Sequence, residues 1–227
     1  MGNFAQNSAK RWHLLYLETT MKRILMLLAN GVKPLEIAAF TDVFGWADLV
    51  GDQAFTLVHA GLRSEILTTF GLNLRISNLL DELDLGDYDA LALPGGSEPA
   101  GFYEEALSTP YLSAIKHFAD AGKPVASVCV SSIALGMAGV LEGRNATVYH
   151  QIGGKRKQQL VDTGARFVDR PVVVDGNFMT SSGPGTASEV AFLLLERLSS
   201  KDNALHVRQR MRFDTPSQHW FETPQVI

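Results

Sequence analysis

The chain has 227 residues, of which 46% are apolar and 19% charged, and this length and composition allow one globular domain with a sizeable core. The formal net charge of −4 gives no sign of a nucleic-acid-binding surface. A single cysteine excludes an internal disulfide and a multi-cysteine zinc site and suits a reducing compartment, and no apolar run reaches the ~20 residues of a membrane span. We therefore expect a cytoplasmic protein without nucleic-acid or membrane partners.

From Met21 onward, the sequence alternates segments typical of buried strands with segments typical of amphipathic helices. Short continuous apolar runs indicate the strands, and apolar residues spaced three to four apart indicate the helices. Turn pairs such as Asn30-Gly31 and Gly95-Gly96 separate the two kinds of segment. In chain order, the expected elements are a strand at 23–29, a helix at 34–50, strands at 54–60 and 88–94, a helix at 112–122, a strand at 124–128, a helix at 131–138, a hairpin at 172–181 and a helix at 186–198.

Strands that alternate with helices predict an α/β fold, in which right-handed crossovers build a mostly parallel sheet with helices on both faces. The Asp175-Gly176 pair predicts the hairpin, and Thr186 followed three residues later by Glu189 predicts a capping box for the last helix. We divide the chain into an N-terminal extension at 1–20, one domain at 21–200 and a C-terminal tail at 201–227. The tail carries prolines and aromatic residues, so we expect it to lie on a surface of the protein.

Cys129 is placed where the strand at 124–128 turns into the helix at 131–138. Sites in open α/β sheets form at the carboxyl ends of strands. A tight turn there is expected to project the thiol into solvent, and the helix N-terminus is expected to favour the thiolate. The amide of Val130, with a second amide from Gly95 or Gly96, would then hold an oxyanion. A lone cysteine is more often an inert core residue, but this position favours a nucleophile.

A catalytic thiolate also needs a group that exchanges protons with the substrate. His150 follows the helix that begins after Cys129, but sequence spacing alone cannot place it near the thiol, and a polar loop histidine is the alternative. Glu36 lies in the first turn of the helix at 34–50, at the same edge of the sheet. Its alternative role is compensation of the helix dipole.

Four blocks of the sequence carry a family resemblance: LLANGVKPLE (27–36), YDALALPGG (88–96), VASVCVSSIAL (125–135) and DGNFMTSSGPGTASEVAFLLLE (175–196). In this order they resemble the first strand with its acidic residue, the glycine loop, the cysteine elbow and the closing hairpin of the ThiJ/PfpI superfamily. These proteins are flavodoxin-like relatives of the class I glutamine amidotransferases. The similarity spans about 21–199 and is closest to the branch of the parkinsonism-associated deglycase.

The resemblance implies a flavodoxin-like three-layer sandwich with Cys129 as the nucleophile. It also implies that Glu36 hydrogen-bonds the cysteine sulfur and that His150 is the family's histidine after the elbow helix. A protonated Glu36 beside a thiolate fits a carboxyl pKa raised by burial and by the neighbouring charge. Gly183 and Pro184 would wall the substrate pocket. Family members are usually homodimers, and the implied chemistry needs no metal or organic cofactor.

The residues after Cys129 depart from each branch of the superfamily. Val130 stands where the protease-like branch has a histidine and the isocyanide hydratase branch a threonine, which disfavours both activities. Ser131 and Ser132 replace a glycine and a proline of the deglycase branch. We therefore expect Val130 and Ser131 to line the substrate site and to alter its shape.

Three functions follow from these residues. In the first, Cys129 attacks a small reactive carbonyl such as methylglyoxal or its adducts, and Glu36 and His150 shuttle protons in a glyoxalase III- or deglycase-like conversion. In the second, the protein is a stress-protective redox sensor whose Cys129 is oxidised to sulfinic acid. In the third, it is a regulatory ligand-binding module, which the absence of a DNA-binding domain disfavours. An isocyanide hydratase-like or other hydrolase is the remaining enzymatic alternative.

Overall fold

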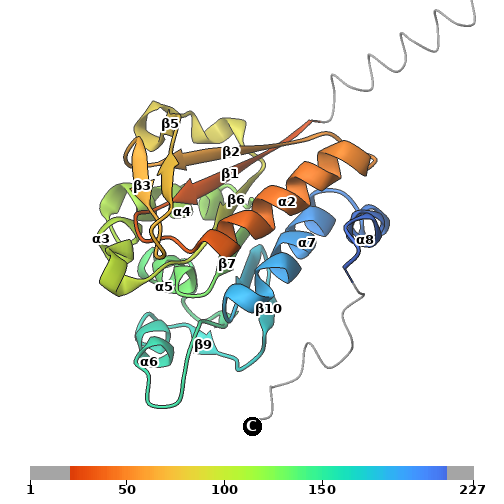
Figure 1. Cartoon of the computed structure of the whole chain (residues 1–227). Helices are drawn as coiled ribbons and strands as arrows, with labels where there is room; N and C mark the ends of the chain where they lie inside the picture. The colour runs from red at the N-terminus through yellow and green to blue at the C-terminus, as the bar shows by residue number, and fades with distance from the viewer. Residues whose placement is uncertain (1–20, 214–227) are drawn as a thin grey trace, which may run out of the picture.

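The computed structural model describes residues 21–213, and a seven-stranded sheet is its central layer (Figure 1). The strand order is β10-β11-β7-β6-β1-β2-β5, and all neighbouring strands are parallel except the β10–β11 hairpin. The strands of this sheet are β1 (Lys22–Leu28), β2 (Phe55–Gly61), β5 (Asn78–Leu79), β6 (Ala90–Leu93), β7 (Val125–Val128), β10 (Val172–Asp175) and β11 (Phe178–Ser181).

Helices cover both faces of the sheet, which confirms the predicted three-layer α/β fold. Helices α2 (Pro34–Val50) and α7 (Ala187–Leu198) pack against each other in front of the sheet in Figure 1, and α4 (Thr109–Asp120) and α5 (Ser131–Met137) lie behind it. The first helix has the bounds that its apolar spacing predicts. Shorter helical elements are α3 (Phe102–Ala106), α6 (Arg156–Val161), η1 (Leu80–Glu82), η2 (Leu85–Asp87), η3 (Glu98–Ala100) and η4 (Pro184–Thr186).

Two small sheets complete the domain. The antiparallel pair is β3 (Glu65–Leu67) with β4 (Asn73–Arg75), and the parallel pair is β8 (Asn145–Ala146) with β9 (Arg166–Phe167). The core lies between the central sheet and its two helical layers. Residues 24–28 of β1 are buried on both faces of the sheet, which explains why this strand is a continuous apolar run.

The predicted capping box at the start of α7 is wrong. Thr186 is the N-cap residue, but its side chain makes no cap hydrogen bond and instead donates to the carbonyl of Gly183 at 2.8 Å. Glu189 forms a buried ion pair with Arg208 rather than reaching back to the N-cap. The box fails because a better partner, a guanidinium from the helix that follows α7, is available to the glutamate.

The first part of the segment predicted to be a tail is the helix α8 (Lys201–Arg210), which packs on α2 and α7. The guanidinium of Arg208 also lies 4.3 Å from the ring centroid of Phe192, which in turn contacts Phe213. The predicted extension at 1–20 and residues 214–227 of the predicted tail lie outside the described residues. Within 21–213, none of the helices combines the length and apolar character that crossing a membrane requires.

Candidate active site

Cys129 occupies the corner between β7 and α5, as predicted, and its backbone conformation is unusual. Its φ of 61° lies in the left-handed region, which side chains other than glycine rarely adopt. The strand pairing of Val128 with Ser181 and a hydrogen bond from the Cys129 amide to the Ser181 carbonyl, at 2.9 Å, hold the corner in place. Such strain persists where the surrounding structure imposes it, and it is typical of a nucleophile elbow.

The thiol is buried, so the expectation that the corner projects it into solvent is wrong. Only 1% of Cys129 is exposed. Desolvation raises the pKa of Cys129, and the negative charge of Glu36 raises it further. The Val130 amide, which hydrogen-bonds the sulfur, and the charge of Lys33 lower this pKa by less. The expected lowering of the thiol pKa by a helix N-terminus is therefore outweighed, because α5 has only seven residues and the site excludes water.

Glu36 is fully buried at the start of α2, which a solvent-exposed compensator of the helix dipole would not be. Its Oε2 accepts a hydrogen bond of 2.6 Å from the amide of Gly95. Desolvation raises the pKa of Glu36 from 4.5 to about 7, although the Gly95 hydrogen bond, the charge of Lys33 and the interaction with Cys129 each lower it. A carboxyl with this pKa exchanges its proton near neutral pH.

The carboxyl and the thiol form one coupled acid–base pair. Each group changes the pKa of the other, and the second carboxyl oxygen of Glu36, Oε1, is buried without a hydrogen-bond partner within residues 21–213. Because burial opposes two negative charges at this position, the pair carries at most one near neutral pH. The pair therefore shares one proton, which lies on Glu36 when the sulfur attacks as a thiolate, and a protonated Glu36 beside a thiolate stays a prediction.

The glycine loop after β6 approaches the elbow more closely than other residues would allow. A Cβ on Gly95 would lie 2.6 Å from the Val128 carbonyl oxygen and 3.0 Å from the Cβ of Cys129. A Cβ on Gly96 would lie 2.2 Å from the ring of Phe102. These contacts explain the glycine pair by close packing.

The two glycine amides have different roles. The Gly95 amide is committed to Glu36, so the expectation that it could donate to an oxyanion is wrong. The neighbouring amides of Lys33 and Ser97 pair with Gly95 and Gly31, and no hydrogen bond from the Gly96 amide occurs within residues 21–213. The Val130 amide faces the Cys129 sulfur, so it is beside the reacting atom, and the binding of an oxyanion by Gly96 and Val130 stays a prediction.

The serines after Val130 are structural, which corrects the expectation that Ser131 binds substrate. The Ser131 hydroxyl is fully buried and donates to the carbonyl of Pro94 at 2.8 Å. The Ser132 hydroxyl is equally buried and pairs with Ser127 at 3.0 Å. Both hydroxyls therefore fasten α5 to the core, and the Ser131 bond also fixes the glycine loop beside the elbow.

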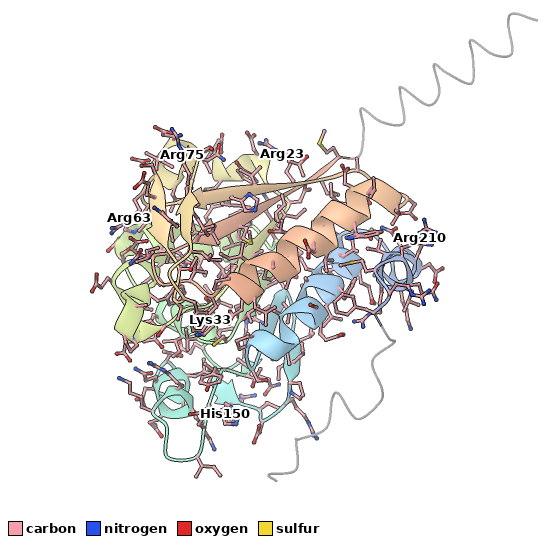
Figure 2. The ribbon with its side chains drawn as sticks, in the orientation of Figure 1. Arg23, Lys33, Arg63, Arg75, His150 and Arg210 are labelled. Carbon is pink, nitrogen blue, oxygen red and sulfur yellow. The ribbon has the colours of Figure 1, made fainter. Side chains whose placement is uncertain are left out.

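The His150 imidazole contacts groups other than the thiol, although the amide of the preceding residue, Tyr149, lies 3.4 Å from the Cys129 carbonyl oxygen. The catalytic role that the resemblance implies for His150 stays a prediction. The His150 Nδ1 lies 3.0 Å from the Val148 carbonyl oxygen and its Nε2 lies 3.2 Å from Oδ1 of Asp169. The ring also packs edge-on against Phe167, with centroids 4.9 Å apart. Figure 2 shows His150 well apart from Lys33, the residue whose charge acts on both Glu36 and Cys129.

The loop that contains Gly183 and Pro184 begins two residues after Ser181, the partner of Val128 at the end of β7. Gly183 is buried beside the Tyr149 ring, and a Cβ there would lie 3.3 Å from this ring. The loop is therefore adjacent to the elbow, as predicted. Contact of Gly183 or Pro184 with a substrate stays a prediction.

Two residues near the pair were not predicted from the sequence. Lys33 is the N-cap residue of α2, and its ammonium lies 5.1 Å from the ring centroid of Phe70. Tyr103 follows the glycine loop; burial raises its pKa to about 12, and the charge of Cys129 contributes to this rise. The place of Lys33, three residues before Glu36, was a usable signal for a nearby cation. Tyr103 had no such signal.

The fold and the strained cysteine elbow define a class of flavodoxin-like proteins with a buried cysteine–glutamate pair. A comparison with protein families identifies the class: the chain belongs to the DJ-1/PfpI family, whose model matches residues 22–197. This confirms the resemblance drawn from the four sequence blocks.

Individual relatives agree with this assignment. A Pyrococcus abyssi protein named a deglycase is 32% identical over 163 residues, which are 72% of this chain and 91% of the relative. The Arabidopsis thaliana protein DJ-1 homolog B is 30% identical over 187 residues, and the chain spans only 40% of its length. The crystal structure of Drosophila melanogaster DJ-1beta matches 86% of this chain and all of that chain, with a TM-score of 0.75 and 27% identity.

Proposed function

We propose that the protein is a cofactor-independent cysteine enzyme that acts on small 2-oxoaldehydes such as methylglyoxal, or on their adducts. The observation that carries this proposal is the coupled pair of Cys129 and Glu36 beside the Gly96 amide, which has no hydrogen bond within the described residues. The relatives named deglycases support a deglycase-like activity.

The first step is addition of the thiol to the aldehyde. The Cys129 sulfur bonds to the aldehyde carbon while the Glu36 carboxylate takes the thiol proton. The amides of Val130 and Gly96 stabilise the oxyanion that forms on the aldehyde oxygen. Glu36 then returns the proton to this oxygen, which gives a hemithioacetal and restores the carboxylate.

The second step is an internal redox reaction within the bound substrate. Glu36 removes the hydrogen on the former aldehyde carbon as a proton, and the neighbouring ketone oxygen receives a proton as the electron pair moves, which gives an enediol. The hydroxyl on the sulfur-bearing carbon then loses its proton while the former ketone carbon gains one. The former aldehyde carbon is oxidised to a thioester and the ketone carbon is reduced to an alcohol. Water then hydrolyses the thioester, which releases lactate and the free thiol, so methylglyoxal and water together account for every atom of the product.

Lactate formation from methylglyoxal tests this proposal directly. The wild type is expected to turn over, and Cys129→Ser is expected to be inactive. Ser132→Ala is a matched control that is expected to keep turnover, because this buried hydroxyl pairs with Ser127 on β7 rather than with the glycine loop. The absence of lactate with the wild type, or its formation by Cys129→Ser, would contradict the proposal.

A stress-protective role is the second candidate, and one observation favours it. The Val130 amide and the Glu36 carboxyl both act on the Cys129 sulfur, so they could also hydrogen-bond the oxygens of a sulfinate. Burial of the thiol works against rapid oxidation. Peroxide treatment followed by mass spectrometry of Cys129 measures this alternative.

A further inference from the structure

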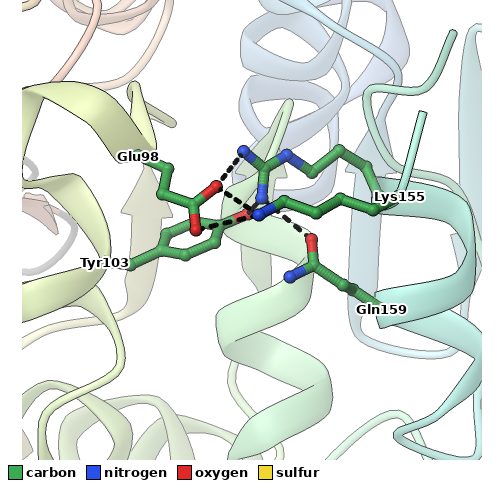
Figure 3. A network of polar contacts seen from close by, with 5 residues as sticks. Glu98, Tyr103, Lys155 and Gln159 are labelled. Atoms are coloured by element: carbon green, nitrogen blue, oxygen red, sulfur yellow. Dashed lines mark hydrogen bonds and ion pairs between the residues drawn. The ribbon is translucent and has the colours of Figure 1, made fainter.

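A network of polar side chains joins the segment after the glycine loop to helix α6 (Figure 3). At its centre, the Arg156 guanidinium donates to the Tyr103 hydroxyl at 2.8 Å, to Gln159 at 2.8 Å and to Glu98 at 2.7 Å. Lys155 adds an ion pair to Glu98 at 2.9 Å. The network therefore holds the Arg156 guanidinium, which in turn contacts the hydroxyl and the ring of Tyr103.

Tyr103 follows the glycine loop that packs against the elbow. Gly95 touches Cys129, and the adjacent Gly96 packs against the ring of Phe102, the residue before Tyr103. On the other side, α6 packs on α5, the helix that begins after the elbow. The charge of Cys129 acts on the Tyr103 phenol, which places the two groups within electrostatic range.

The hydrogen-bonding pattern leaves the Tyr103 proton available. A guanidinium has only donors, so the Tyr103 oxygen is the acceptor in its bond with Arg156. No acceptor for the Tyr103 O–H occurs in the described chain, 21–213. Arg156 also donates hydrogen bonds to Glu98 and Gln159, so the donor in this network that is available to a ligand is the Tyr103 O–H.

We propose that Tyr103 is a specificity-determining residue whose hydroxyl donates a hydrogen bond to the second carbonyl oxygen of a 2-oxoaldehyde while Cys129 attacks the aldehyde carbon. This inference rests on the proposed function. The amides of Val130 and Gly96 serve the aldehyde oxygen, so the neighbouring oxygen needs a separate donor. A simple aldehyde lacks that oxygen and gains nothing from Tyr103, which makes the residue selective for substrates with two adjacent oxygens.

Protection of Cys129 from alkylation by iodoacetamide tests the proposal without requiring turnover. Methylglyoxal and propanal are compared as protecting aldehydes. In Tyr103→Phe, the methylglyoxal concentration that half-protects Cys129 is expected to rise roughly tenfold, the effect of one lost hydrogen bond, and the propanal concentration is expected to stay unchanged. The control is Tyr88→Phe. The Arg23 guanidinium lies 4.7 Å from the centroid of the Tyr88 ring, so this tyrosine also contacts an arginine. Tyr88 precedes β6, however, and the glycine loop follows β6 at the other end of the strand.

The outcomes separate the two proposals. If methylglyoxal protects the wild type and Tyr103→Phe equally, or if Tyr103→Phe weakens protection by both aldehydes to the same extent, the role of Tyr103 is refuted while the proposed function stands. If neither aldehyde protects the wild type, the proposed function fails and this inference fails with it. Arg156→Lys is a second variant, which keeps a positive charge beside Glu98 but loses the guanidinium hydrogen bond to Tyr103. It is also expected to raise the methylglyoxal concentration that half-protects Cys129.

Discussion

Replacing Glu36 by glutamine will change how the stability of the protein depends on pH. Folding raises the pKa of this carboxyl from 4.5 to about 7, so the folded state binds more protons than the unfolded state between these values. The stability that this group contributes is fully present below pH 4.5 and is lost as the pH rises through 7. At ~1.4 kcal/mol per pKa unit, the loss amounts to about 3 kcal/mol. Glutamine stays neutral, so Glu36→Gln avoids this loss.

Urea unfolding of both proteins at pH 4.5 and pH 8 measures the effect. The wild type is expected to lose about 2 to 3 kcal/mol relative to Glu36→Gln between the two pH values. Glu104→Gln is the matched control, because Glu104 lies in the first turn of α3 but is exposed, and it should follow the wild type. Parallel pH curves for the wild type and Glu36→Gln would refute the raised carboxyl pKa and with it the base in the proposed mechanism.

Four further predictions concern packing, the histidine and assembly. Gly95→Ala places a Cβ against the backbone of β7, so it is expected to lower the free energy of unfolding by about 1–3 kcal/mol and to abolish lactate formation. Gly45→Ala is the control, because its Cβ would meet open space, and it should be no less stable than the wild type. Equal melting temperatures for the two variants would contradict the close packing of Gly95. His150→Asn is expected to keep turnover within about threefold, and a loss of ~10²-fold or more would restore His150 to the catalytic set. Arg208→Met leaves Glu189 buried without this partner, so chemical unfolding should show a loss of about 3–5 kcal/mol, and an unchanged midpoint would refute the buried ion pair. Light scattering is expected to give the mass of a homodimer, and a monomer mass would overturn that prediction.

Much of the fold was predictable because its signals are local. The apolar run of β1 and the helical spacing of α2 are properties of consecutive residues, and Asp175-Gly176 specifies its hairpin within a few positions. The capping box failed because Glu189 found a partner on α8, which no local pattern includes.

The candidate site was predictable only in part for the same reason. The elbow at Cys129 follows from a strand that meets a helix, and Glu36 follows from its place at the same edge of the sheet. Burial of the thiol depends on how loops from distant segments cover that edge. The contact between Tyr103 and Arg156 joins residues 53 positions apart, and the orientation of His150 depends on Asp169.

The central claim is that Glu36 carries protons for Cys129, and turnover of methylglyoxal by Glu36→Gln measures it most directly. Glutamine keeps the shape and can accept the Gly95 hydrogen bond, but it cannot take or release a proton. Lactate formation is expected to fall ~10²–10⁴-fold while Cys129 remains open to oxidation by peroxide, as judged by mass spectrometry. Full turnover by Glu36→Gln would show that Glu36 is structural and would contradict the account.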